Sequence, residues 1–175
     1  DASLVGYQAK PLEGDATLYL FQRANSKLDS FQRGEGLRFS LNSDLAIFKI
    51  TPGFDTLRTL KLKKVKKNKW PKDSLCILSL RDDTLVKVSG LKKYALSKEG
   101  NTLCYLTNST VKAKGWRPFS KAKPSRKVNT LHVYTAYPNI FLALEGVTDF
   151  RLSDDGNRLA VLKELTIDKK KSYSI

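Results

Sequence analysis

Few side chains in this sequence have the chemistry of a nucleophile, a general base or a metal ligand. The chain of 175 residues has one histidine, His132, and two cysteines, Cys76 and Cys104. A serine hydrolase needs a histidine as general base, and an α/β-hydrolase presents its serine in the pentapeptide Gly-x-Ser-x-Gly. That pentapeptide does not occur, and His132 lies inside the apolar run 131–134, which favours a packing role within a strand. We therefore assign no catalytic residue to this chain.

Metal chemistry has little support either. Two cysteines without the Cys-x-x-Cys spacing and a single histidine do not supply four zinc ligands. The sequence Asp154-Asp155-Gly156 lacks the spaced acidic ligands and the closing glutamate of a calcium loop, and we interpret it as a hairpin turn. We predict no metal site and no cofactor. The cysteines fall in different predicted strands, which favours two buried free thiols and leaves a disulfide open.

Basic residues are concentrated in two segments. Residues 56–72 contain eight lysines and arginines and no acid, and residues 108–128 contain seven and no acid. The chain has 32 basic and 17 acidic residues, so the 17 basic residues outside these segments balance the acids. The net charge of +15 therefore belongs to two insertions. They also hold both tryptophans, Trp70 and Trp116.

Three interpretations of these basic insertions remain open. The preferred one is docking on another part of the same protein or on an acidic partner, with a tryptophan as anchor; contact with an anionic membrane surface is a lesser variant. The second is a solvated charge run with no partner. The third, least favoured, is binding of single-stranded nucleic acid by lysines and aromatic stacking. The candidate interaction residues are Lys61, Lys63, Lys64, Lys66, Lys67, Trp70, Lys114, Trp116 and Arg117.

A repeat of 56 to 57 residues predicts the elements that hold these insertions. In each repeat a leucine opens an apolar run, at Leu18, Leu75 and Leu131. A glycine closes the next run, at Gly34, Gly90 and Gly146, and a serine ends the run after that, at Ser40, Ser97 and Ser153. A period near fifty made of short apolar runs is typical of radially arranged β-sheets. We predict an all-β chain, a partial β-propeller of four-stranded antiparallel blades with very little helix.

The strand assignment divides the single propeller segment 1–175 into two complete blades and parts of two others. The complete blades are 36–89 and 92–145, and the partial ones are 1–33 and 148–175. Hairpin turns are predicted at Asn42-Ser43, Glu99-Gly100 and Asp155-Gly156. Both insertions then join the second strand of a blade to the third, so we expect them on one face of neighbouring blades. A propeller ring needs about four to eight blades, so we expect a segment of a longer protein. A complete β-sandwich is the alternative, but it leaves the repeat unexplained.

Three stretches resemble a known family. They are Glu13-Gly14-Asp15-Ala16-Thr17-Leu18, then Asp55-Thr56-Leu57-Arg58 with the lysine run, and Trp70-Pro71-Lys72-Asp73-Ser74-Leu75. They resemble the N-terminal propeller of bacterial, exported prolyl oligopeptidase-type serine peptidases. The hairpin pattern 152–160 is similar to a signature that these propellers share with TolB-like ones.

The resemblance implies a non-catalytic propeller in a secreted or periplasmic serine peptidase. In such a parent enzyme, a hydrolase, the propeller gates or shapes substrate access to a separate α/β-hydrolase domain. The implied partners are the remaining blades, that hydrolase domain and a peptide substrate. A propeller that only binds proteins or glycans, with no enzymatic domain, stays open as the alternative. The sequence shown contains no signal peptide and no apolar run of about 20 residues that would span a membrane.

Overall fold

The computed structural model of the protein describes residues 4–99, 101–111, 126–135, 140–167 and 170–174. In these residues the chain forms antiparallel sheets of three, four, four and three strands, each made of strands that are consecutive in the sequence. The chain divides into two compact units, Asp1–Ser89 and Gly90–Ile175. Each unit contains one three-stranded and one four-stranded sheet. The short apolar runs of the repeat have thus become strands, as their content of β-branched and aromatic residues favours.

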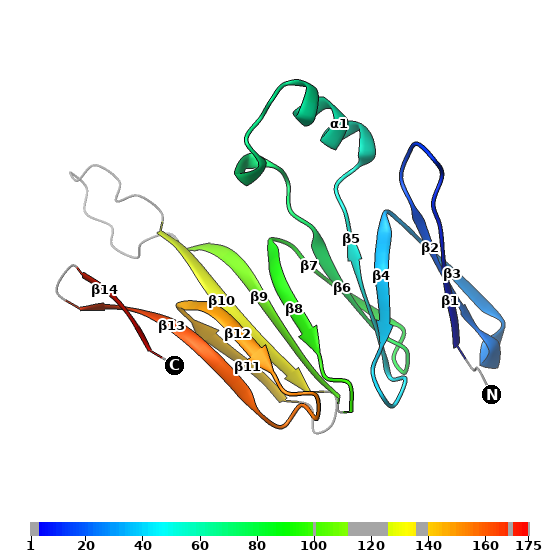
Figure 1. Cartoon of the computed structure of the whole chain (residues 1–175). Coiled ribbons are helices and arrows are strands. Elements are labelled where there is room, and N and C mark those ends of the chain that lie inside the picture. The colour runs from blue at the N-terminus through cyan, green and yellow to red at the C-terminus, as the bar shows by residue number, and fades with distance from the viewer. Residues whose placement is uncertain (1–3, 100, 112–125, 136–139, 168–169, 175) are drawn as a thin grey trace, which may run out of the picture. The chain divides into compact units, whose positions relative to one another are not determined.

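The first unit begins with a meander of three strands and continues with one of four (Figure 1). The three-stranded sheet consists of β1 (Leu4–Ala9), β2 (Thr17–Gln22) and β3 (Lys27–Gln32). The four-stranded sheet consists of β4 (Gly34–Phe39), β5 (Leu45–Ile50), β6 (Ser74–Ser79) and β7 (Thr84–Val88). A short 3₁₀ turn, η1 (Arg23–Asn25), links β2 to β3.

The core of the first unit lies between its two sheets. Leu18 and Leu20 alternate with more exposed residues along β2, and they pack in one cluster with Phe48 of β5 and Cys76 of β6. All four side chains are almost completely buried. The sheets approach closely, because a Cβ atom on Gly34 would meet the Cβ of Leu18 at 2.6 Å. The glycine that marks the repeat here is therefore required by packing.

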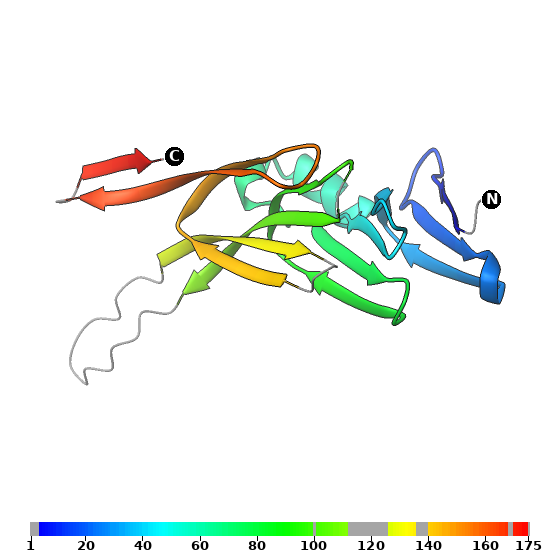
Figure 2. The ribbon, with the colours of Figure 1, turned by 90° about the horizontal axis from the view of Figure 1, so that it is seen from below.

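The second unit also contains two sheets, but here the four-stranded sheet comes before the three-stranded sheet along the chain. Its four-stranded sheet consists of β8 (Leu91–Leu96), β9 (Thr102–Val111), β10 (Arg126–Thr135) and β11 (Ile140–Glu145). Its three-stranded sheet consists of β12 (Val147–Leu152), β13 (Leu159–Ile167) and β14 (Lys170–Ser174). β12 pairs with the first half of β13 and β14 with the second half, as Figure 2 shows. The core cluster contains Cys104, Leu106 and Leu131 from the first sheet and Val147 and Phe150 from the second.

The repeated serines close the repeated hairpins. The hydroxyl oxygen of Ser40 accepts the backbone N–H of Leu45 at 3.0 Å, and that of Ser97 accepts the N–H of Thr102 at 3.0 Å. Ser153 holds Arg158 in the same way at 2.9 Å. Each serine N–H also donates to the carbonyl of the same partner. The serine at this place in the repeat therefore satisfies a backbone donor that the turn would otherwise leave without a partner.

Charged residues at corresponding repeat positions pair between neighbouring sheets. The shortest N–O distance is 2.6 Å from Lys27 to Asp83, 2.6 Å from Lys93 to Asp149 and 2.7 Å from Lys98 to Asp154. Each pair is 56 positions apart, which is one repeat length. Each pair lies within one unit. The hydrogen bond to Asp83 raises the pKa of Lys27, and the hydrogen bond from Lys93 lowers the pKa of Asp149.

These observations confirm the all-β, partial-propeller prediction, with two four-stranded blades and parts of two others. The sequence predicted very little helix and assigned none to the insertion 56–72. Its first part belongs to an α-helix, α1 (Phe54–Leu62), and a 3₁₀ turn, η2 (Lys67–Lys69), follows. The apolar pattern was too short for a helix to be predicted, because Phe54, Leu57 and Leu60 cover fewer than three turns.

Candidate interaction surface

The first basic insertion, residues 56–72, leaves the four-stranded sheet of the first unit between β5 and β6. Ile50 and Ser74 are paired across these strands, so both ends of the connection start side by side. Figure 1 shows α1 beyond the end of the sheet, above β5 and β6. The exit is fixed by an ion pair of 3.2 Å between Lys49 and Asp73. The N–H of Thr51 donates to the carbonyl of Arg33, which fixes the other end.

Helix α1 is capped by a residue from the connection between β1 and β2. The residue at its N-cap, Gly53, has no side chain that could accept a hydrogen bond. Instead, an Asp15 carboxylate oxygen accepts the N–H of Phe54 at 2.7 Å. A helix leaves its first N–H groups without internal partners, and a carboxylate there also interacts favourably with the helix dipole. The turn before β2 therefore holds the start of α1.

The C-terminal end of α1 forms a Schellman motif. The N–H of Lys64 donates to the carbonyl of Lys61, and the N–H of Val65 donates to that of Leu60, both at 3.0 Å. Lys64 has a φ of 51°, in the left-handed region where glycine is usual at this place. A side chain with a Cβ costs about 1 kcal/mol in this conformation. The sequence gives no sign of this bend, because it carries no glycine there.

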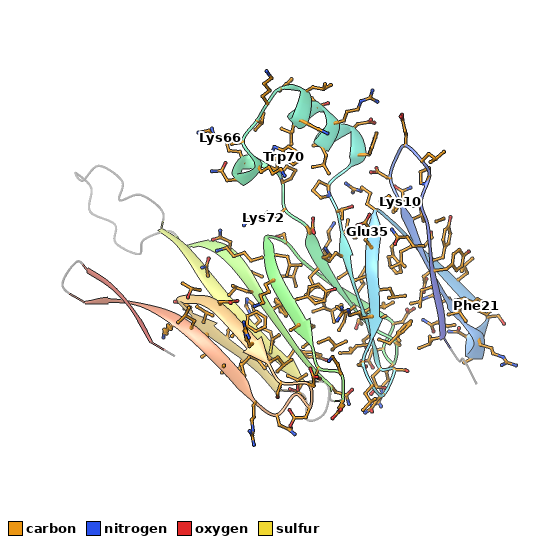
Figure 3. The ribbon with its side chains drawn as sticks, viewed as in Figure 1. Lys10, Phe21, Glu35, Lys66, Trp70 and Lys72 are labelled. Atoms are coloured by element: carbon orange, nitrogen blue, oxygen red, sulfur yellow. The ribbon has the colours of Figure 1, made fainter. Side chains whose placement is uncertain are left out.

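Trp70 packs against its own insertion. Its indole N–H donates to the carbonyl of Val65 at 2.8 Å, and the side chain is half-buried. Phe54, Leu57 and Leu60, which are spaced along one side of α1, are half-buried as well. In Figure 3, Trp70 lies between α1 and η2, whereas Lys66 points outward. The indole therefore braces the insertion, and its N–H group already has a partner.

The basic side chains of the insertion lie on its outside. All eight are exposed: Arg58, Lys61, Lys63, Lys64, Lys66, Lys67, Lys69 and Lys72. None of them forms an ion pair with a carboxylate in the part of the chain that the structure describes. The one acidic residue in the first turn of α1 is Asp55, at the end opposite to the lysines. The surface formed by these eight residues, here called the lysine surface, is therefore uniformly positive.

The second basic insertion lies largely outside the described residues. Strand β9 extends to Val111 and β10 begins at Arg126, with these two residues paired. The insertion 108–128 thus begins and ends within strands. The predicted interaction residues Lys114, Trp116 and Arg117 lie outside the described residues. That both insertions share one face stays a prediction.

His132 lies in an aromatic stack on the second unit. Its ring is stacked on Tyr105 with centroids 4.8 Å apart, and Phe141 lies at 5.5 Å. The imidazole Nε2 is 3.3 Å from the Thr107 hydroxyl, and burial lowers the pKa of the histidine. Nδ1 has no hydrogen-bond partner among the described residues. This surrounding suits a neutral, packed ring rather than a general base oriented by a carboxylate.

The two cysteines are buried free thiols, each in the core cluster of its own unit. Burial raises the pKa of both, that of Cys104 to about 11, which keeps the thiols protonated and unreactive at neutral pH. Across the described residues, no group of three or more histidine, cysteine, aspartate or glutamate side chains is placed to hold a metal ion. No helix in the described part is long and apolar enough to cross a membrane.

Comparisons with known proteins return structural likeness only. No protein-family model matches the chain, and no curated protein matches it. Among solved structures, it is similar to an acylaminoacyl peptidase in complex with Z-Gly-Gly-Phe-chloromethyl ketone, with 11% identity, a TM-score of 0.45 and coverage of 100% of this chain and 31% of that chain. It is also similar to the β-propeller domain of the Trilobed protease from Pyrococcus furiosus, with 8% identity, a TM-score of 0.47 and coverage of 98% and 49%.

A third neighbour is the acylaminoacyl peptidase of Pyrococcus horikoshii, with 9% identity, a TM-score of 0.43 and coverage of 99% of this chain and 30% of that chain. The chain thus spans between 30% and 49% of the length of these three proteins. They are peptidases or the propeller domain of a protease, the class of protein that the sequence resembles. At this identity the likeness concerns the fold, and no activity follows from it.

Proposed function

We propose that this chain is the non-catalytic propeller part of a prolyl oligopeptidase-like serine peptidase. In this proposal the propeller shapes substrate access to a hydrolase domain that this chain does not contain. The parent would act on peptides, and its remaining blades and hydrolase domain would be the partners of this chain. The main alternative is a propeller that binds proteins or glycans without any enzymatic domain.

The observation that carries the proposal is the meeting of the three family-like stretches at one end of the first unit. Asp15, from the first stretch, accepts the N–H at the start of α1, next to the second. Trp70 and Asp73, from the third, fix the end of the same insertion through Val65 and Lys49. The family-like residues therefore hold a projecting element in place. These contacts contain no nucleophile with a base, so we assign them no catalytic role. A projecting element that is held in place in this way could limit the access of substrate to a neighbouring domain.

An activity probe on the full-length parent tests the first half of the proposal. A fluorophosphonate reagent labels the activated serine of a serine hydrolase. We expect labelling of the parent and none of residues 1–175, which lack the elbow pentapeptide. A parent that stays unlabelled would favour the binding-only alternative.

Shortening the insertion tests the second half. Because Ile50 and Ser74 are paired, residues 51–73 can be replaced by a tight Asn-Gly turn that closes the β5–β6 hairpin. If the insertion restricts access, the parent variant should cleave long peptides faster and short peptides at the unchanged rate. A matched parent variant that keeps the insertion and carries Lys87→Gln should behave as the wild type. Equal rates on both substrates for the shortened variant would contradict a gating role.

A secreted or periplasmic location is also proposed, on the basis of the resemblance alone. Cell fractionation of the native host tests it: the parent should be found with the periplasmic or extracellular material. Recovery in the cytoplasmic fraction only would count against this part of the proposal and leave the peptidase part standing.

A further inference from the structure

We propose that the lysine surface is a docking site for an acidic polypeptide segment supplied by another molecule. The proposal goes beyond the peptidase assignment, since binding can be measured without any hydrolysis. The contacts would come from the outward-facing lysines around the end of α1, above all Lys63, Lys66 and Lys67. These three are exposed and unpaired among the described residues.

The contrast in charge pairing is the first reason. On the strands and hairpin turns of the sheets, five basic residues have a carboxylate partner, namely Lys27, Lys49, Arg81, Lys93 and Lys98, and ones unpaired among the described residues, such as Lys87 and Arg151, stand singly. On the insertion, eight basic residues gather with no described carboxylate partner. Like charges held within a Debye length of about 8 Å repel one another, so the concentration of charge opposes folding of the insertion. An acidic ligand would neutralise these charges, and the loss of repulsion would make the free energy of binding more favourable.

The partner must come from outside this chain. Outside the two basic insertions, the 17 acids of the chain are matched by 17 basic residues, so the chain has no surplus of carboxylates for this surface. A second copy is a poor candidate as well, because it carries the same net charge of +15. Charge complementarity thus favours a separate, carboxylate-rich partner.

The lysine surface is already folded in the free chain. The Asp15 carboxylate caps the start of α1, the Schellman hydrogen bonds end it, and the indole of Trp70 is bonded to Val65. A ligand would therefore meet charges on an ordered backbone and avoid the free energy of ordering a loop. Lys64 adds to this argument, because the insertion keeps a lysine with a φ of 51° where glycine would relieve strain.

Carboxylates fit this surface better than nucleic acid or lipid. Single-stranded nucleic acid is held by aromatic rings that stack on bases, and the indole of Trp70 is half-buried with its N–H already bonded. Helices that lie in a membrane surface bury an apolar face in the lipid as well as attracting anionic head groups, and the large apolar side chain exposed on this insertion is Leu62. Dispersed, flexible lysine ammonium groups match carboxylates spread along a peptide.

A binding measurement with a defined probe tests the proposal. Fluorescence anisotropy of a labelled oligoglutamate peptide, titrated with the full-length protein, should show binding that weakens as salt is added. The triple variant Lys63→Gln, Lys66→Gln, Lys67→Gln should weaken this binding about fivefold to tenfold, from the loss of three exposed charge pairs. The matched control is Lys87→Gln, Arg151→Gln, Lys163→Gln, which removes the same charge from exposed positions on strands. It should bind within about twofold of the wild type, since it leaves the lysine surface unchanged.

Several results would overturn the proposal. Absence of peptide binding, or equal weakening in both triple variants, would show that the lysine surface recognises nothing beyond net charge. An oligothymidylate of the same charge, or phosphatidylserine vesicles, serves as competitor. Tighter binding of either one through Lys63, Lys66 and Lys67 would replace the acidic peptide by that partner. Circular dichroism of each variant checks that the fold is intact, so weaker binding cannot come from unfolding.

Discussion

The sheets and the first basic insertion differ in how their basic residues are paired. On the sheets, Lys27, Lys93 and Lys98 each meet an aspartate one repeat length away. On the insertion, eight basic side chains meet no carboxylate among the described residues. The difference follows from the repeat. Within each unit, corresponding positions of the two sheets lie close enough for a lysine to pair with an aspartate 56 residues away, whereas an insertion beyond the sheet end has no such neighbour.

The two regions are also stabilised differently. The sheets bury leucines and phenylalanines in two core clusters, and the hairpins between the strands are closed by serines. Helix α1 buries no residue completely and depends on a few individual contacts, from Asp15, Lys64 and Trp70. A change on the sheets should therefore affect the whole unit, and a change on the insertion should act locally.

A core truncation should give the largest effect and the clearest separation of the two regions. Leu131 has no exposed surface and belongs to the core cluster of the second unit. Leu131→Ala should lower the free energy of unfolding by about 2–5 kcal/mol, from lost burial and the cavity left behind. Leu62, which is 75% exposed, is the control on the insertion. Leu62→Ala should change it by less than about 0.5 kcal/mol. Urea unfolding measures both, and equal effects would contradict the contrast.

The repeated serine should give the next largest effect. Ser97 is 4% exposed and its hydroxyl accepts the N–H of Thr102. Ser97→Ala removes the side-chain partner of this part-buried N–H and should cost about 1–3 kcal/mol. Ser153 makes the same bond in a more exposed hairpin, where water can replace the hydroxyl. Ser153→Ala should therefore cost clearly less in the same unfolding experiment, and a larger loss for Ser153 than for Ser97 would refute this reasoning.

The serines also show how far the sequence predicts the fold. Ser40, Ser97 and Ser153 recur with the repeat. The turns predicted at Asn42-Ser43 and Asp155-Gly156 lie between paired strands, and Gly100 of the predicted turn Glu99-Gly100 lies outside the described residues. Each serine accepts a hydrogen bond from a residue five positions later, so the same residue type is needed at the same place in every repeat and appears in the sequence as a period. The ion pairs between sheets carry the same kind of signal, because aligning the repeats places a lysine over an aspartate.

The insertion shows why the remainder was not predicted. The N-terminal cap of α1 comes from Asp15, 39 residues before Phe54, and no local pattern announces such a contact. The end of the helix depends on Lys64 in a conformation that the sequence would assign to glycine. The basic residues themselves were found from composition alone. Their surroundings, including the bonded indole of Trp70, required the structure.

A smaller and local effect should come from Lys64. Lys64→Gly relieves the left-handed strain and should stabilise the end of α1 by about 1 kcal/mol. Amide hydrogen exchange at Leu60 to Val65 should slow by about fivefold, with no change in the sheets. Lys63, whose φ is −74°, is the control. Lys63→Gly should speed exchange in the same segment, because glycine there only adds freedom to the unfolded chain. Slower exchange in both variants would show that charge, and not backbone strain, governs this helix end.

The smallest effect we predict is a dependence of stability on pH that comes from the sheets and not from the insertion. Burial lowers the pKa of His132 from 6.5, so the unfolded chain binds the proton more readily than the folded one. The contribution of the neutral ring is fully present above 6.5 and is lost as the pH falls below that value through the folded-state pKa.

His132 is the only histidine of the chain, and histidine is the side chain whose ordinary pKa lies between about pH 8 and pH 5.5. The urea midpoint of the wild type should fall on acidification, by less than the change produced by Ser97→Ala. His132→Gln should be less stable at both pH values, because the stack on Tyr105 is lost, but its midpoint should not change between them. Lys66→Gln should keep the pH dependence of the wild type. If His132→Gln keeps it too, the titrating group lies elsewhere, and the aromatic stack does not hold the histidine neutral.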